Sequence, residues 1–383
     1  MALRRRGRGS KAIAIISSIL CVILFALCAV VAIDVIAYKE NVRIAEGYDF
    51  IGSPLTPVME DGVYTFYTDE EFKILQLTDV HIGGGAFSVG KDRKALDAVA
   101  TLIKRVKPDL VVVTGDIAYP VPFQSGTLDN RREAELFISL MDTLGVYYAV
   151  CFGNHDTEDY SLYRRDDLYN LYKSSKYCLI DRAENVDDIN YAINVKNSSG
   201  LITQTLYMMD THSYVTGFID EYDGLHENQI AWYESEVNRM NNINKAIDPN
   251  AGVVKSLTFI HIPLREYETA WEEYRANGYK DTENAKYYYG VAKEKDEKVC
   301  CSVPEDRFFE TALALGSTQG VFCGHDHVNI WSVEYKGIRL TYGMSIDHLA
   351  YFGIENETEQ RGGTIITISP EGAMEIEQTR LVG

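Results

Sequence analysis

The sequence has little positive charge and no regular cysteine pattern. Its 383 residues include 37 Lys and Arg against 56 Asp and Glu, which gives a formal net charge of −19 at pH 7. Proteins that follow a nucleic-acid backbone need a basic surface, so this balance indicates that nucleic acid is not a partner. With 46% hydrophobic and 24% charged residues, the chain can bury one large core, in one or two domains.

The seven cysteines have none of the spacings typical of a disulfide framework or a zinc knuckle. Two of them lie in an apolar N-terminal stretch. Cys151 and Cys323 end apolar runs that are predicted to be buried strands, where free thiols act as small hydrophobic groups. Adjacent cysteines such as Cys300 and Cys301 seldom pair with each other, because the geometry is strained. The sequence alone leaves their redox state open.

Residues 12–33 form one long apolar run, interrupted only by Ser17 and Ser18. The run is long enough to span a bilayer, which needs about 20 residues, so we predict a transmembrane helix over residues 12–37. A buried core helix is the alternative, but it would not normally follow a basic segment at the start of a chain. The basic residues before the run are Arg4, Arg5, Arg6, Arg8 and Lys11.

The charges around this run predict its orientation. Residues 1–11 are expected to be a cytoplasmic basic tail, and Asp34 and Glu40 follow the run, so the remainder is expected outside the cytoplasm. Cleavage after Val35-Ile36-Ala37 is the alternative. We favour an uncleaved signal anchor in the cell membrane, because the run is longer than the about 7 to 15 residues of a signal-peptide core.

Residues 38–69 mix Gly, Pro and acidic residues with little periodicity, which predicts a stalk or linker. Residues 70–383 are expected to form the main domain. Strand-like apolar runs alternate there with helical patterns, and no internal repeat is visible, which indicates an α/β architecture. The predicted strands are 73–77, 110–113, 147–151, 205–209, 257–260 and 320–323, and the predicted helices are 92–107, 131–144 and 228–240.

The pattern changes towards the C-terminus. Residues 267–299 are rich in Tyr, Glu and Lys without apolar periodicity, and we predict a surface loop there, either near a functional site or simply solvated. Beyond residue 330, short strands follow one another without helices between them, which predicts a mixed sandwich with helices outside two packed sheets. These strands are 331–335, 338–341, 364–369 and 373–377.

Five short polar motifs stand where predicted strands end. Strand ends of open α/β sheets converge on one edge, so these distant side chains are expected to meet. Imidazole, carboxylate and amide groups suit divalent or trivalent first-row metals, whereas the lack of thiolate disfavours soft-metal and structural zinc sites. A single histidine after a strand is usually a loop or core residue, but five of the eight histidines are found here. The motifs are Asp79-Val80-His81, Gly115-Asp116, Gly153-Asn154-His155-Asp156, His261 and Gly324-His325-Asp326-His327.

The order and spacing of these motifs resemble those of the calcineurin-like metallophosphoesterases, from about Phe72 to the C-terminus. Residues 72–79, 261–264 and 323–329 resemble the branch related to purple acid phosphatases. The resemblance implies a four-layer α/β/β/α sandwich, which agrees with the predicted order of strands and helices.

The resemblance also implies a site for two transition-metal ions, either iron, manganese or zinc. The ions would share a hydroxide that attacks phosphorus in line, and they would supply the local positive charge that an acidic chain needs for a phosphorylated substrate. The implied ligands form two groups that share one bridging carboxylate: Asp79, His81, Asp116 and His327 for one ion, and Asp116, Asn154, His261 and His325 for the other.

His155 is similar to the family residue that stands beside the metals, donates to a phosphoryl oxygen and protonates the leaving alcohol. Asp156 is expected to hold the imidazole of His155 and to favour its charged form. A polar turn after a strand is the alternative. Tyr119 matches the tyrosine that binds ferric iron in purple acid phosphatases, but those enzymes usually have glycine in place of His81. Tyr119 is therefore expected to pack beside the metals rather than to bind one.

Two further residues are candidates at the mouth of the site. His212 follows Asp210 and is expected either to line the crevice or to be an ordinary loop histidine. Arg265 comes soon after His261 and is placed to meet a substrate, although exposed arginines are common. Gly83-Gly84-Gly85 lacks the lysine and helix of a phosphate-binding loop and is expected only to allow a turn.

Together these features predict a membrane-anchored, extracytoplasmic hydrolase of phosphate monoesters or diesters, with a small-molecule, lipid or protein substrate. A narrower alternative is a nucleotide or lipid-headgroup phosphodiesterase. An alternative of another class is a surface protein that holds metals and binds phosphorylated ligands without turnover. A pure binder has no need of a leaving-group acid such as His155, which favours the enzyme.

Overall fold

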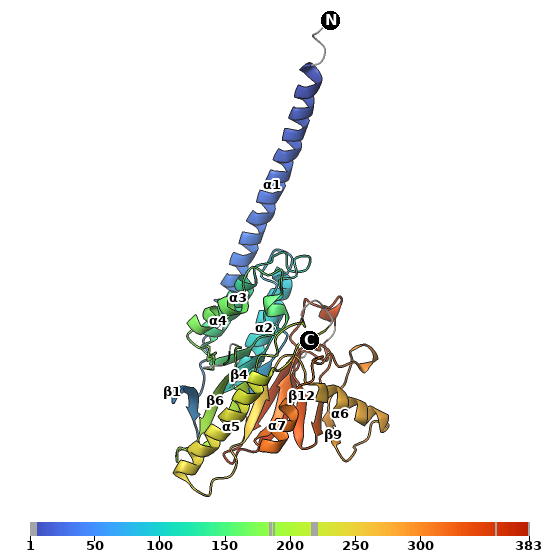
Figure 1. Cartoon of the computed structure of the whole chain (residues 1–383). Helices are drawn as coiled ribbons and strands as arrows, with labels where there is room; N and C mark the ends of the chain where they lie inside the picture. Colours follow the sequence, from blue (N-terminus) through green and yellow to red (C-terminus); the bar gives the residue numbers. More distant parts are fainter. Residues whose placement is uncertain (1–5, 184–185, 187, 216–220, 357, 382–383) are drawn as a thin grey trace.

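Two packed β-sheets with helices on both outer sides form the body of the protein (Figure 1). The computed structural model describes residues 6–183, 186, 188–215, 221–356 and 358–381, so the first five residues of the predicted basic tail lie outside it. The layer order confirms the four-layer α/β/β/α sandwich.

The smaller sheet has five strands in the order β14-β13-β3-β4-β5. Its first three strands in the chain run parallel, with Leu75 opposite Val111 and Val112 opposite Ala149, and the last two are antiparallel additions. All five positions of β4 are buried, as expected of a strand covered on both faces. The strands are β3 (Phe72–Leu77), β4 (Leu110–Thr114), β5 (Tyr148–Cys151), β13 (Gly362–Ile368) and β14 (Met374–Arg380).

The larger sheet has nine strands in the order β1-β2-β6-β7-β8-β10-β12-β11-β9. Its centre, β7-β8-β10-β12, is parallel, so the carboxyl ends of these strands lie at one edge. The strands are β1 (Val58–Glu60), β2 (Val63–Tyr67), β6 (Tyr191–Lys196), β7 (Ile202–Met208), β8 (Ser256–Phe259), β9 (Ala285–Tyr289), β10 (Thr318–Cys323), β11 (Ser332–Tyr335) and β12 (Ile338–Tyr342).

Amphipathic helices cover the outer faces of both sheets. α3 shows how the sequence sets their limits: the Asp129 side chain accepts the amide of Arg132 at 3.3 Å, and Gly145 ends the helix in the left-handed region with φ 71°. α2 (Val89–Val106), α3 (Asn130–Leu144) and α4 (Arg165–Ser174) cover the smaller sheet, and α5 (Glu227–Ile247), α6 (Arg265–Ala276) and α7 (Phe308–Leu315) cover the larger one. Short 3₁₀ turns lie at His155–Thr157, Lys295–Glu297 and Ile354–Asn356.

Two hydrophobic cores hold these layers together. The larger core joins α2 and α3, the five-stranded sheet and the facing side of the nine-stranded sheet, where Phe259 stacks on Phe322 at 5.2 Å. The second core lies behind the nine-stranded sheet, under α5, α6 and α7. Cys151 and Cys323 are buried in these cores as predicted, and all seven cysteines, which are among the described residues, are free thiols.

The prediction of a surface loop over residues 267–299 is wrong. The segment instead contains most of α6 and the edge strand β9. α6 buries Tyr267, Ala270, Trp271 and Tyr274, which are spaced at i, i+3, i+4 and i+7 as on one face of a helix. Two of these four positions are tyrosines, whose rings pack in the core like apolar side chains.

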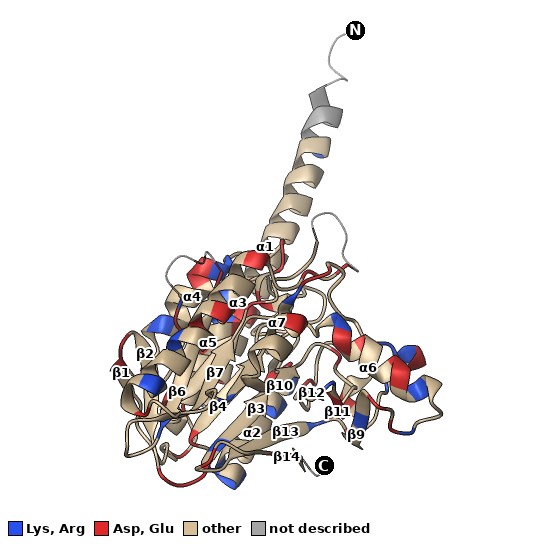
Figure 2. Ribbon diagram, turned by 60° about the horizontal axis from the view of Figure 1, so that its bottom comes forward, with Lys and Arg blue, Asp and Glu red and all other residues tan. Residues whose placement is uncertain are grey.

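Helix α1 (Arg6–Ala45) contains one apolar stretch, within Lys11–Ala45, that is long enough to cross a membrane, with a mean hydropathy of 3.1. Figure 2 shows this helix projecting from the body, with acidic residues where it meets the body. The prediction of an irregular stalk over residues 38–69 is wrong. α1 continues to Ala45, and β1 and β2 add the next residues to the nine-stranded sheet.

The last turns of α1 pack against α2 and α3. Ala37, Asn41 and Ala45 are buried at four-residue intervals, so they form one face of the helix. The side chain of Asn41 donates to the carboxylate of Asp92 at 2.8 Å. This face is small and partly polar, so it leaves little apolar periodicity in the sequence.

We expect Asn41→Ala to lower the free energy of unfolding of the full chain in detergent by about 1 to 3 kcal/mol, because it removes a buried hydrogen bond to a carboxylate. Lys39→Ala, at an exposed position of the same helix, is the matched control and should change stability by less than about 0.5 kcal/mol. Denaturant unfolding measures both, and equal stability of the two variants would contradict the docking of α1 on the body.

Candidate metal centre

The five polar motifs meet where the carboxyl ends of the two sheets lie side by side. Asp79, His81, Asp116 and Asn154 follow strands β3, β4 and β5 of the smaller sheet, whereas His261, His325 and His327 follow β8 and β10 of the larger one. Backbone bonds continue the ladders past the strand ends: Asp79 donates to Gly115 at 3.1 Å, and Gly324 donates to His261 at 3.1 Å. The site therefore needs both sheets, not one sheet edge.

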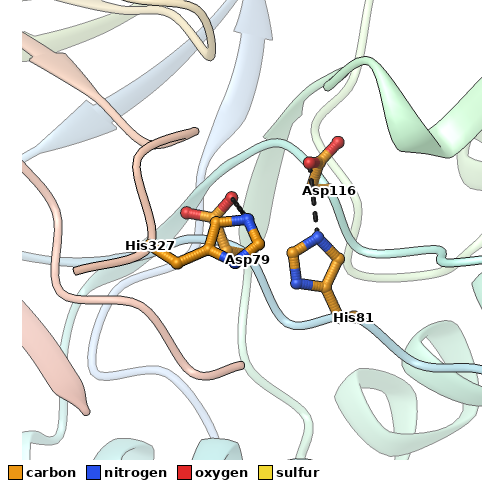
Figure 3. A group of neighbouring side chains, drawn as sticks. All are labelled: Asp79, His81, Asp116 and His327. Carbon is orange, nitrogen blue, oxygen red and sulfur yellow. Dashed lines mark hydrogen bonds and ion pairs between the residues drawn. The ribbon is translucent and has the colours of Figure 1, made fainter. Parts of the chain in front are cut away.

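Asp116 lies at the centre of the cluster and is fully buried. Its Oδ2 atom is 3.3 Å from Nε2 of His81 and 3.3 Å from Nε2 of His261. On the side of His81, Nε2 of His327 lies 3.7 Å from Oδ1 of Asp79 (Figure 3). These four carboxylate and imidazole side chains, Asp79, His81, Asp116 and His327, can direct one ligand atom each at a common point.

A second group shares Asp116. Asp116, His261 and His325 can also direct ligand atoms at one point. Nε2 of His261 lies 3.3 Å from Nδ1 of His325 and 3.1 Å from Oδ1 of Asn154. The structure thus brings together all seven side chains that the sequence indicated, in two groups joined by one carboxylate.

The hydrogen bonds around the cluster leave bare nitrogen lone pairs pointing inward. Nδ1 of His261 donates to the carbonyl of Thr114 at 2.8 Å, so in the neutral ring Nε2 carries no proton and directs its lone pair at the oxygens of Asp116 and Asn154. Lone pairs that converge on oxygens repel one another unless a cation lies between them. Ligand atoms that are about 2.0 to 2.2 Å from one tetrahedral ion lie about 3.3 to 3.6 Å apart, close to the 3.3 Å that separates Asp116 from His81 and from His261. These residues fit a pair of cations.

The electrostatics of the cluster agree with this fit. Burial raises the pKa of Asp116, but the imidazoles of His261 and His155 outweigh that effect and hold it well below its ordinary value. Burial lowers the pKa of His261, yet the charge of Asp116 raises it to about 9. Without metal, the buried carboxylate thus favours protons on His81 and His261, and bound cations would take the place of those protons.

Four of the seven candidate ligands have left-handed backbone conformations that non-glycine residues rarely adopt. The φ angles are 50° at Asp79, 48° at His81, 53° at Asp116 and 77° at His325. Such conformations cost on the order of 1 to 3 kcal/mol each and persist where the surroundings enforce them. Gly115 is required beside them, because it has φ 89° and a β-carbon there would lie 2.4 Å from Nδ1 of His261.

The partner of His155 differs from the prediction. Nδ1 of His155 lies 2.7 Å from Oε1 of Glu158, three residues further along, and not beside Asp156. The buried carboxylate of Asp156 accepts the backbone amides of Asp116, Ala118 and Gly153 at 2.8 to 3.0 Å. Asp156 therefore fixes the loop that carries Asp116, and Glu158 orients the imidazole. The 3₁₀ turn that begins at His155 brings Glu158 back to the ring.

Tyr119 packs beside the cluster, as expected from the presence of His81. Its ring lies edge-on to His81 and to His155, with both centroids at 4.9 Å. Its hydroxyl donates to Gln124 at 3.1 Å. The hydroxyl is therefore engaged away from the ligands.

His212 and Arg265 lie outside the buried cluster. His212 stacks on His226 at 4.1 Å and lines a neighbouring cavity of about 380 Å³, which meets the cluster through Ser213, whose hydroxyl donates to the carbonyl of Asn154. Among the described residues, Arg265 contacts Glu305 at 3.2 Å and the carbonyl of Val303. The prediction that Arg265 meets a substrate at the mouth gains no support from these contacts.

Asp347 is, after Glu158, a second residue that the sequence motifs did not indicate. Its buried carboxylate lies 3.3 Å from Nδ1 of His81 and 3.0 Å from Nδ1 of His327, so it directs Nε2 of both rings towards Asp79 and Asp116. Burial raises the pKa of Asp347, but the two imidazoles hold it well below its ordinary value. An Asp-His pair shortly after β12 was the only signal in the sequence, and it belongs to none of the strand-end motifs.

Comparisons with known proteins agree with this geometry. A model of the calcineurin-like phosphoesterase family matches residues 72–329. A probable inactive purple acid phosphatase 29 from Arabidopsis thaliana is 26% identical over 78% of this chain and 78% of its own length. The phosphatase DCR2 from Saccharomyces cerevisiae is 28% identical over 74% of this chain and 48% of its own length.

The fold is also found among solved structures. A dimetal phosphatase from Danio rerio superposes with a TM-score of 0.50 at 13% identity, over 80% of this chain and 95% of that chain. At this identity the likeness concerns the fold alone.

We expect Asp347→Asn to weaken metal binding at the group of His81 and His327 by about 10- to 100-fold, because both imidazoles lose the carboxylate that orients them. Metal content after dialysis against a buffered metal series measures this loss. Asp109→Asn is the matched control, since Asp109 is a buried carboxylate that accepts the amide of Lys73 at the start of β3. Equal metal affinity in the two variants would contradict the role of Asp347.

Proposed function

Because the chain belongs to the calcineurin-like phosphoesterase family, we propose that it is an active hydrolase of phosphate monoesters or diesters that uses two metal ions. One observation carries the proposal: the carboxylate of Asp116 lies 3.3 Å from an imidazole of each ligand group, as a bridge between two ions requires. We propose that the ions are iron, manganese or zinc, and the proposal does not choose among these metals.

Each residue of the cluster has a defined task in this reaction. When bound, a metal pair supplies a hydroxide near neutral pH and positive charge against the phosphoryl oxygens. Asp116 and the six other ligands hold that pair in a buried site. His155 lies beside the ligands. Its backbone amide donates to Oδ1 of Asp116 at 2.9 Å, and Nδ1 of its ring lies 2.7 Å from Oε1 of Glu158. It can donate to a phosphoryl oxygen and return a proton to the leaving alcohol.

We also propose a subcellular location for the protein. The apolar stretch of α1 supports a single membrane anchor, and the basic residues before it and acidic residues after it support an extracytoplasmic body. The substrate is then a phosphorylated small molecule, lipid or protein outside the cytoplasm.

A second candidate is a metal-holding protein without turnover. The word "inactive" in the names of the Arabidopsis relatives favours it. Against it stand all seven ligands and the pairing of His155 with Glu158 in this chain, since a binder needs no oriented proton donor.

We expect Asp116→Asn to lose most bound metal and all activity, because both ligand groups lose their shared charge. His155→Ala should keep the metal and lose about 10²- to 10⁴-fold in rate, as expected for removal of a general acid. Metal analysis and hydrolysis of chromogenic phosphate monoesters and diesters measure these effects on the purified full chain. The ratio of the two rates also separates a phosphatase from a phosphodiesterase.

Arg265→Ala is the matched control for these variants, because Arg265 contacts Glu305 and Val303 on the surface. It should hydrolyse both esters at the rate of the unchanged protein. Full activity of His155→Ala, or bound metal without hydrolysis in the unchanged protein, would favour the binder over the enzyme.

A further inference from the structure

The body of the protein begins where the apolar run of α1 ends. α1 is one continuous helix, so no flexible stalk separates the two parts. Asp34 is the first charged residue after the run, and its carboxylate lies 2.6 Å from the guanidinium of Arg132 in α3. One turn later, Tyr38 donates to Glu135 of the same helix at 2.8 Å. These contacts fix the orientation of the body relative to the anchor.

Three loops at this end of the body are joined to one another, and we call them the rim loops: residues 83–88, 119–127 and 349–354. The amide of Phe87 donates to Ser125 at 3.1 Å. The side chain of Gln124 donates to the carbonyls of Leu349 at 3.0 Å and Ala350 at 2.7 Å. The second rim loop leads into the start of α3, beside Arg132, and Figure 1 shows the segment between β4 and α3 rising next to the lower end of α1.

Each rim loop carries one phenylalanine that is exposed to solvent. The exposed fractions are 67% for Phe87 and 92% for Phe123, and Phe352 is fully exposed. Leu162, whose amide donates to Leu128 at the end of the second loop, is 63% exposed. Single exposed apolar residues are common, whereas several that gather on joined loops are typical of an interaction surface.

The rim loops also border the metal centre. Tyr119, in the second loop, packs edge-on to His81 and His155. Tyr351, in the third loop, stacks on His327 at 4.2 Å with an interplanar angle of 17°. Two of the loops that carry the exposed phenylalanines therefore also contact histidines of the cluster.

We propose that the rim loops rest on the bilayer that α1 spans, with Phe87, Phe123 and Phe352 in the interface, and that the metal centre acts on phosphate esters held at that membrane surface. The proposal rests on the proposed function for the membrane anchor and for the substrate class. Two observations select the bilayer over another partner: α1 fixes this end of the body next to the end of its apolar run, and the loops present separate apolar tips. Such tips enter the boundary between headgroups and acyl chains by about 5 to 10 Å.

Tryptophan fluorescence of the full chain in nanodiscs tests the docking. The tryptophan introduced by Phe123→Trp should emit at a shorter wavelength than a tryptophan in water. Most of its fluorescence should be quenched when the lipids are brominated along their acyl chains. Val253→Trp is the matched control, because Val253 is 46% exposed and belongs to the segment between α5 and β8, and Figure 1 shows the end of α5 far from α1. Its added fluorescence should not change. Equal responses of the two variants would overturn the docking.

Replacing the three rim phenylalanines by serine tests the substrate class. The triple variant should hydrolyse para-nitrophenyl phosphate at the unchanged rate but lose on the order of tenfold on phosphatidic acid in the same nanodiscs, because weaker docking lowers access to lipid. Equal loss on both substrates, or no loss on either, would overturn a bilayer-held substrate.

The two proposals fail in different ways. Absence of hydrolysis of both compounds by the unchanged protein would remove the proposed function, and with it the substrate class. The quenching of Phe123→Trp needs no catalysis and would still decide whether the rim loops lie on the bilayer.

Discussion

The carboxylate of Asp116 is the constraint on which the rest of the site depends. One of its oxygens lies between imidazoles that follow β3 in one sheet and β8 in the other, at 3.3 Å from each. Carboxylate and imidazole lone pairs can converge in a buried space only when positive charge lies among them. The packing of the two sheets around Asp116 therefore produces a cluster that suits two cations.

The surroundings of the cluster serve to keep this convergence in place. Asp347 directs His81 and His327, the carbonyl of Thr114 directs His261, and Asp156 holds the loop of Asp116 through three backbone amides. The left-handed conformations at four ligands show that the fold supplies stability to hold them. The strand ladders that continue past the strand ends provide that support.

The N-terminal helix gives the site a fixed position in addition to a fixed shape. α1 reaches the body without a break and binds α2 and α3 through Asn41, Asp34 and Tyr38. The rim loops that lie near this junction also contact the ligand histidines. In this arrangement α1, the rim loops and the cluster around Asp116 form one connected unit.

Much of this protein could be predicted from its sequence because the signals are local. Apolar periodicity predicted most strands and helices, the run of residues 12–33 predicted the apolar helix, and strand-end motifs indicated seven side chains that the fold brings together. Three features escaped prediction. The aromatic face of α6 was missed because its tyrosines were counted as polar residues. The docked turns of α1 were missed because their contact face is small and partly polar. Asp347 was missed because it belongs to no strand-end motif.

The sequence by itself determined the kinds of ligand available, their order along the chain and the apolar helix that precedes them. Only the tertiary structure decided that Glu158 and not Asp156 orients His155, that Arg265 pairs with Glu305, and that Asp347 joins two ligand histidines. These pairings depend on how the loops after the strands turn and on how the two sheets pack. Such directions are set by contacts between residues far apart in the chain, which local patterns do not encode.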